Sequence, residues 1–190
     1  IIVIADASNL KRSLFLCSQI IDLKIPVVLV LNMMDLAVHK GLLPDVKKLE
    51  QALGIKVIPA IVRQKTGIEE IKKAVLHTIP LPESDIMPAT TLAPELIQEI
   101  KQSFPVKSDY AAYLLAGNYD KVDISFVGNE GKQKLDMLLQ KHQFSQKTMQ
   151  ATETLERYKT ISVLLKSCVS EPASVRKSLT RTVDNLVTHR

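Results

Sequence analysis

The sequence predicts an α/β fold followed by an all-α region, and two observations support this prediction. In the first 80 residues, short apolar runs alternate with amphipathic helical patterns, which is typical of a parallel sheet covered by helices. After a proline-rich connector the strand pattern ends and helical patterns continue. We therefore expect a partial doubly wound parallel sheet of three strands within residues 1–80. A linker at 81–91 and a C-terminal helical bundle domain at 92–190 would follow.

The three predicted strands are apolar runs rich in β-branched residues, at residues 1–5, 27–31 and 57–62. Unbroken runs of this kind suit strands that are buried on both faces. A helical pattern follows each run, so the predicted order is strand, helix, three times over. Connections between parallel strands in one sheet are right-handed, which fixes the expected crossovers.

The helices of the first part are predicted from an apolar stripe and from their end signals. The first stripe consists of Leu10, Leu14, Cys17 and Ile21. Asp45 is a suitable N-cap and Gly54 a suitable stop for a second helix. Thr66 and Glu69 have the spacing of a capping box for a third helix.

Five further stripes predict the helices of the second part. The first of these helices has Pro94 in its first turn, the second ends near Gly117, and the third contains Leu135. The longest stripe consists of Ala151, Leu155, Tyr158, Ile161, Leu165 and Cys168. The last stripe consists of Val175, Leu179, Val183 and Leu186.

Composition argues against several classes of protein. The formal net charge is +5, but aromatic residues make up 4%, Trp is absent and no dense Lys/Arg run occurs, so we expect no nucleic-acid partner. Cys17 and Cys168 lie too far apart for a disulfide framework or a zinc site and fit small buried thiols. The four histidines share no metal-ligand spacing, so no metal site is expected.

The most informative segment is the end of the second predicted strand, where Asn32 and Asp35 follow a buried run. Open α/β sheets bind ligands at the carboxyl ends of their strands. A carboxylate there can accept two parallel hydrogen bonds from guanine, whose ring N–H and amino group lie side by side, whereas adenine would leave it unpaired. Asn32 would brace the neighbouring loop. Asn and Asp after a strand also commonly form only a turn or a helix cap, and that interpretation remains open for the tetrapeptide alone.

The loop after the third predicted strand favours the nucleotide interpretation. In GTPases this loop supplies backbone N–H groups to guanine, and its spacing from Asp35 suits that role. The flexible thioether of Met33 would cover one face of the base. The candidate base-binding residues are therefore Asn32, Met33, Asp35, Ile61, Val62 and Arg63.

Over nearly its whole length the sequence resembles the family of ferrous iron transport protein B (FeoB). The resemblance in the first part rests on Asp6-Ala7-Ser8-Asn9-Leu10, Leu31-Asn32-Met33-Met34-Asp35, Lys40-Gly41, Leu53-Gly54, Val57-Ile58-Pro59 and Gly67-Ile68. In the second part it rests on Arg157-Tyr158, Ile161, Asp184 and Val187-Thr188-His189. It implies that the sheet is the C-terminal half of a GTPase domain. It also implies that the helices form the family's GDI-like regulatory domain, which favours the GDP-bound form.

This resemblance implies a fragment of a GTP-dependent ferrous iron transporter at the cytoplasmic face of a bacterial inner membrane. The helical domain would couple the nucleotide state to the membrane pore. No G-x-x-x-x-G-K-[ST] motif occurs in the sequence, so the phosphate loop and the Mg²⁺ ligands are expected in a missing N-terminal half. The chain alone is therefore expected to be inactive in GTP hydrolysis. Its expected partners are that half, the transmembrane part, and GTP or GDP, with self-association through an open sheet edge.

Two other hypotheses stay open at this point. One is a non-enzymatic helical interaction module with a degenerate, nucleotide-free α/β cap. It is favoured because Ile61-Val62-Arg63 departs from the Ser-Ala usual in this loop of GTPases. The other is an unrelated doubly wound enzyme in which Asn32 and Asp35 only form a turn. The lack of phosphate-binding glycines after any predicted strand argues against it.

Overall fold

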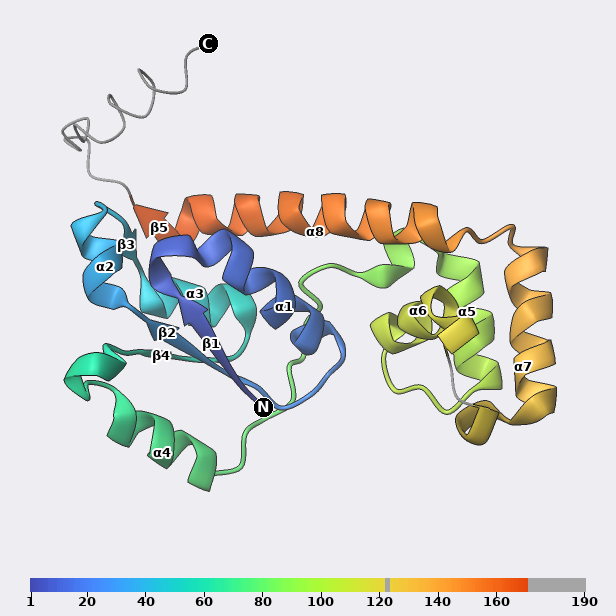
Figure 1. Cartoon of the computed structure of the whole chain (residues 1–190), viewed down its shortest axis with the longest axis horizontal. Helices are drawn as coiled ribbons and strands as arrows, with labels where there is room; N and C mark the ends of the chain where they lie inside the picture. Colours follow the sequence, from blue (N-terminus) through green and yellow to red (C-terminus); the bar gives the residue numbers. More distant parts are fainter. Residues whose placement is uncertain (122–123, 171–190) are drawn as a thin grey trace, which may run out of the picture.

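The structure is a computed structural model that describes residues 1–121 and 124–170 (Figure 1). Its main sheet consists of β1 (Ile2–Asp6), β2 (Val28–Asn32) and β4 (Lys56–Pro59), in the order β1-β2-β4. Both pairings are parallel, with Val3 opposite Leu29 and Leu29 opposite Val57. The predicted three-stranded parallel sheet is confirmed, and β1 lies at an edge of it.

Four α-helices accompany this sheet: α1 (Leu10–Asp22), α2 (Met34–His39), α3 (Val46–Leu53) and α4 (Ile68–Leu76). The predicted stripe of α1 is confirmed, because all four of its apolar residues are buried in the core beside β2. The ends of α3 are confirmed too. Asp45 accepts a hydrogen bond from Lys48 N at 3.1 Å, and Gly54 ends the helix with a φ of 64°.

Two predictions about the loop after the third strand are wrong. The strand ends at Pro59 rather than at residue 62, because Ile61 pairs with Thr66 across a short 3₁₀ turn, Val62–Gln64. The N-cap of α4 is Gly67, not Thr66, and no side chain caps it. Gly67 has a φ of 85°, and a Cβ there would lie 2.6 Å from the Pro59 carbonyl oxygen. Close packing against β4 therefore overrides the local capping signal.

The edge strand β1 is left uncovered on one face of the main sheet, whereas Val28, Val30 and Ile58 on the same face are buried. Ile2 and Ile4 of β1 are 41% and 68% exposed, and α4 buries none of its residues. In Figure 1, α4 lies apart from the other helices, below the sheet. Ile2 and Ile4 therefore point into solvent, whereas Val3 and Ala5 of the same strand are buried, although the whole run is typical of a strand buried on both faces.

The second part contains α5 (Pro94–Ser103), α6 (Asp109–Gly117) and α7 (Ile124–Lys141). They surround a separate core that includes Ile97, Ile100, Tyr113 and Leu135. The predicted start of α5 at Pro94 and the end of α6 at Gly117 are confirmed. α7 is kinked at Gly128, whose φ of 71° is outside the helical range.

The long helix α8 (Gln146–Cys168) runs along both parts in Figure 1. Its Met149 belongs to the second core, whereas Ile161 belongs to the first. After α8, β5 (Val169–Ser170) pairs antiparallel with β3 (Leu43–Pro44) and ties the end of the helix to the α/β part. Neither of these short strands is predicted from the sequence.

The buried stripe of α8 differs from the predicted one. Leu155, which we expected to be buried, is 68% exposed, while Glu153 and Arg157 are buried instead. The stripe predicted at 175–186 and the resemblance at 184–189 lie outside the described residues. In the described part of the chain, no helix combines the length and apolar character needed to cross a membrane.

Candidate functional site

The ends of β2 and β4 meet in one connected loop system. Val62 N donates a hydrogen bond to Asn32 Oδ1 at 3.1 Å, which confirms that Asn32 braces the neighbouring loop. Ala60 N donates to the Leu31 carbonyl at 2.8 Å, which extends the contact between the two strand ends. These two hydrogen bonds are made within the protein, so they hold the loop after β4 against the end of β2 without a ligand.

A cleft of about 510 Å³ opens at this end of the sheet. It is lined by Asn32, Met33, Asp35, Leu36, His39, Ile61 and Arg63. The structure thus brings together all the predicted base-binding residues except Val62, whose N–H is used by Asn32. Sequence reasoning missed Leu36 and His39, because it did not predict α2. A turn of helix directly after Asp35 would have placed them beside it.

Met33 takes a left-handed backbone conformation, with a φ of 60°, and is the N-cap of α2. Its side chain is among the exposed apolar ones and lies in the cleft wall. Leu36 adds a second partly exposed apolar side chain to the same wall. An apolar wall beside a carboxylate is the surface that a flat heteroaromatic ring would require.

Asp35 is engaged by a cation from the opposite loop. The Arg63 Nη2 donates to Asp35 Oδ2, and the two side chains are 77% and 25% exposed, respectively. The carboxylate predicted to read a base therefore meets an N–H donor of a planar guanidinium in the cleft. Another donor could replace Arg63 at the Asp35 carboxylate, because ion pairs exposed to solvent are weak.

Asp6, at the end of β1, has a simpler role. Its side chain accepts a hydrogen bond from Ser8 N at 2.8 Å and so starts the 3₁₀ turn Ala7–Asn9. Asp6 is therefore the N-cap of this turn. Within residues 1–121 and 124–170, no group of three or more His, Cys, Asp or Glu side chains is arranged to hold a metal ion.

Known proteins similar to this chain come from one family. Residues 1–75 match the family of ferrous iron transport protein B. An Fe(2+) transporter FeoB of Legionella pneumophila strain Paris is 29% identical over 192 residues, which cover 100% of this chain and 25% of that protein. The solved cytosolic domain of L. pneumophila FeoB superposes with a TM-score of 0.67 at 27% identity, over 89% of this chain and 67% of that one.

The chain resembles the cytosolic domain of FeoB in sequence and in fold. A solved S. thermophilus FeoB domain, a glutamate-to-alanine mutant bound to GDP, shares the fold with a TM-score of 0.66 at 24% identity. The match covers 86% of this chain and 66% of that one. The chain spans about a quarter of the length of the Legionella FeoB transporters it matches. The candidate cleft lies within the matched residues 1–75.

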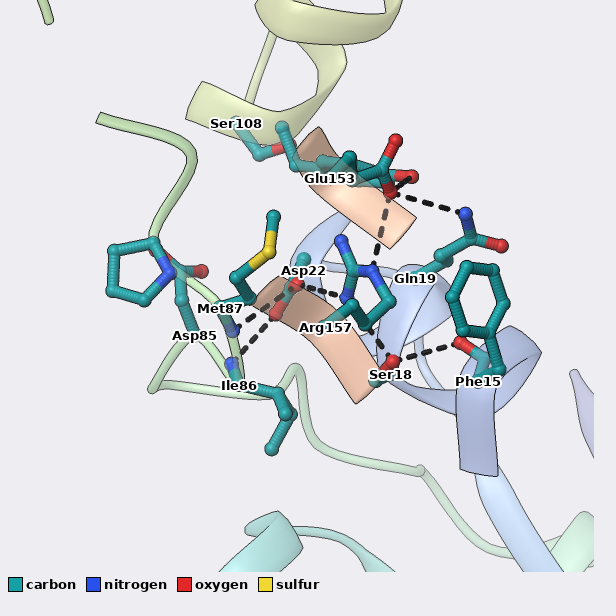
Figure 2. A network of polar contacts seen from close by, with 12 residues as sticks. Phe15, Ser18, Gln19, Asp22, Asp85, Ile86, Met87, Ser108, Glu153 and Arg157 are labelled. Atoms are coloured by element: carbon teal, nitrogen blue, oxygen red, sulfur yellow. Dashed lines mark hydrogen bonds and ion pairs between the residues drawn. The ribbon is translucent and has the colours of Figure 1, made fainter. Parts of the chain in front are cut away.

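A second polar cluster joins α8 to α1. Figure 2 shows Arg157 at its centre. Arg157 Nη1 donates to Asp22 Oδ2 at 2.7 Å and to Ser18 Oγ at 3.0 Å, and its Nε donates to Glu153 Oε1 at 3.1 Å. Gln19 donates to the same Glu153 oxygen at 3.2 Å. We refer to these five residues as the Arg157 network.

The Arg157 network also holds the linker. Asp22 Oδ1 accepts from Ile86 N at 2.6 Å, and Asp22 Oδ2 accepts from Met87 N at 3.4 Å. Burial raises the pKa of Asp22, against the stabilising effect of Arg157 on its charged form. Three segments that are distant in sequence therefore meet at one buried carboxylate.

Tyr110 of α6 contacts two members of the Arg157 network. Its hydroxyl donates to Glu153 Oε1 at 2.6 Å, and the centroid of its ring lies 4.7 Å from the Arg157 guanidinium carbon, Cζ. Burial, followed by the hydrogen bond to Glu153, raises the pKa of Tyr110. The aromatic face lies against a guanidinium whose Nη2 is buried and has no hydrogen-bond partner among the described residues. The sequence signal for this cluster was Arg157-Tyr158, which carries the FeoB resemblance.

Proposed function

We propose that this chain is the guanine-recognising part of the G domain of a ferrous iron transporter, together with its helical domain. The observation that carries the proposal is the cleft at the ends of β2 and β4, where Asp35 faces a loop that Asn32 holds in place. Its volume of about 510 Å³ is within the usual range for a small-molecule site. The proposal is supported by FeoB relatives solved with GDP and in a GMPPNP form.

In this proposal different residues contact the edge and the faces of the base. The Asp35 carboxylate accepts hydrogen bonds from the ring N–H and the amino group of guanine, which adenine cannot supply side by side. Met33 and Leu36 pack against the faces of the ring. Asn32 acts through the loop, since its Oδ1 is occupied by Val62 N.

The described residues do not fit a phosphate and Mg²⁺ site. They offer no cluster of acidic side chains for a metal, and the sequence has no G-x-x-x-x-G-K-[ST] motif. We therefore assign no hydrolytic step to this chain. The phosphate loop and the Mg²⁺ ligands would come from an N-terminal half of the G domain, which would pair with the open side of β1.

The Arg157 network supplies a physical route for coupling in the intact transporter. It connects α1 of the α/β part, the linker and α8 through buried charges. A movement at the nucleotide site would reach the helical domain through this rigid joint, and the helical domain would act on a pore at the cytoplasmic face of the inner membrane.

The base-reading role is tested by titrating the ¹⁵N-labelled chain with guanosine, xanthosine and adenosine. We expect guanosine to shift the amide signals around Asn32 and Ile61 and adenosine to leave them in place. Asp35→Asn should weaken guanosine binding by about 1–3 kcal/mol and improve xanthosine binding, because the carboxamide matches the 2-carbonyl of xanthine. Asp136→Asn, on α7, is the matched control. Guanosine binding that is unchanged in Asp35→Asn would refute the role.

One observation favours the rival function, a nucleotide-free helical interaction module. Asp35 already has a partner in Arg63, so the carboxylate is satisfied without a base. The same titration separates the two hypotheses, since the module would bind none of the three nucleosides.

A further inference from the structure

The partner of Asp35 is chemically similar to the ligand proposed for it. A guanidinium group is a flat carbon bonded to nitrogens that carry N–H donors. The reading edge of guanine contains the same unit, formed by the ring N–H, the carbon at position 2 and the amino group. Resting on the proposed function, we infer that Arg63 is an internal mimic of guanine, which occupies Asp35 in the absence of base and must be displaced for a base to bind.

The position of both side chains supports competition for one place. Asp35 and Arg63 both line the cleft, and the contact between them joins α2 to the 3₁₀ turn Val62–Gln64. A base that hydrogen-bonds to Asp35 would need the space and the acceptor that the Arg63 guanidinium now uses. The two contacts therefore compete for Asp35 Oδ2.

The surroundings keep Arg63 in place but leave its side chain free to move away. The backbone of the 3₁₀ turn Val62–Gln64 is fixed on one side by the bond from Val62 N to Asn32. It is closed on the other side by the pairing of Ile61 with Thr66. The Arg63 side chain is mostly exposed, so it can rotate into solvent without any change in this backbone. Displacement by a base then requires only the loss of one exposed ion pair.

The expected size of the effect follows from that exposure. Exposed ion pairs are worth little, so removing Arg63 should tighten the binding of guanosine by roughly two- to fivefold. Salt gives an independent signature, because it screens an ion pair much more than a hydrogen bond from a neutral base. Guanosine should therefore bind the original chain more tightly as ionic strength rises, and this rise should vanish without Arg63.

The experiment uses guanosine, which has no phosphate to interact with Arg63, and follows amide signals of the whole chain at low and high NaCl. The variants are Arg63→Ala, Asp35→Asn and the double variant, with Lys65→Gln as a charge-matched control in the same loop. Of these variants, we expect only Arg63→Ala to bind guanosine more tightly than the original chain and with an affinity that does not depend on salt. In the Asp35→Asn background, Arg63→Ala should change nothing, because its effect acts through Asp35.

The outcomes separate this inference from the proposed function. Guanosine binding that depends on Asp35 but is equal with and without Arg63 would overturn the mimic and keep the base-reading role. If even Arg63→Ala fails to bind guanosine, both are overturned. A ligand-free measurement checks the contact itself: Asp35→Asn should shift the side-chain Nε–Hε signal of Arg63, and an unchanged signal would also overturn the inference.

Discussion

Arg157 Nη1 and Asp22 Oδ2 lie 2.7 Å apart, and both side chains are fully buried although 135 residues separate them in the chain. Burying either charge alone would be costly, so each depends on the other. Asp22 adds the linker amides at Ile86 and Met87 to the same joint. The pair therefore fixes α8, α1 and the linker relative to one another, and its loss should destabilise the contacts among all three segments.

Removing one partner of this pair should destabilise the fold strongly. Arg157→Met leaves Asp22 buried without its cation, which should lower the free energy of unfolding by about 3–5 kcal/mol. Urea denaturation followed by circular dichroism measures it. Lys159→Met, at an exposed position of the same helix, should change the value by less than about 1 kcal/mol. Equal losses in the two variants would contradict a buried joint, and Asp22→Asn added to Arg157→Met should restore part of the stability.

The chain should not release phosphate from GTP. Phosphoryl transfer requires a phosphate cradle and metal ligands. The sequence has no G-x-x-x-x-G-K-[ST] motif, and the described residues form no group of three or more His, Cys, Asp or Glu side chains for a metal. With GTP and Mg²⁺ in excess, a phosphate-release assay should stay at the level of a protein-free blank. Turnover that disappears in Asp35→Ala would contradict this prediction.

The open edge of β1 should make the chain self-associate. Ile4 is 68% exposed on a strand that pairs with β2 alone among the described strands. Apolar edges of this kind pair with other chains unless they are covered. Light scattering should show a mass that rises with concentration, and Ile4→Lys should reduce the rise. Leu81→Lys, an exposed position in the linker, is the control and should leave it unchanged.

The pH dependence of Cys17 has a defined sign. Burial raises the pKa of its thiol from 9.0 to about 12. The folded state thus holds the proton more tightly, so this contribution to stability is complete below pH 9.0 and is lost as the pH rises towards 12. At pH 8, alkylation of Cys17, quantified by peptide mass spectrometry, should be at least about a hundredfold slower in the folded chain than in urea. Equal rates would mean that the thiol is accessible.

Local chemistry determined much of the fold from the sequence alone. The runs of β-branched residues predicted the parallel strands, because such runs are typical of parallel sheets; both faces are buried at β2 but not at β1. The residues at both ends of α3 fixed its limits, because an N-cap carboxylate and a left-handed glycine act within one turn of the helix. The pairing of Asn32 with the next loop could also be predicted, since the ends of parallel neighbours share one edge of the sheet.

Only the tertiary structure decided the rest. The N-cap of α4 is Gly67 rather than Thr66, and β4 approaches Gly67 so closely that a Cβ would not fit there. Glu153 and Arg157 take the buried side of α8 in place of Leu155, because their charges find partners in α1 and α6. Arg63 meets Asp35 only once two loops are folded against each other. Apolar periodicity reports the burial of side chains that need no partner, whereas a buried or paired charge depends on groups that come near it only in the folded chain.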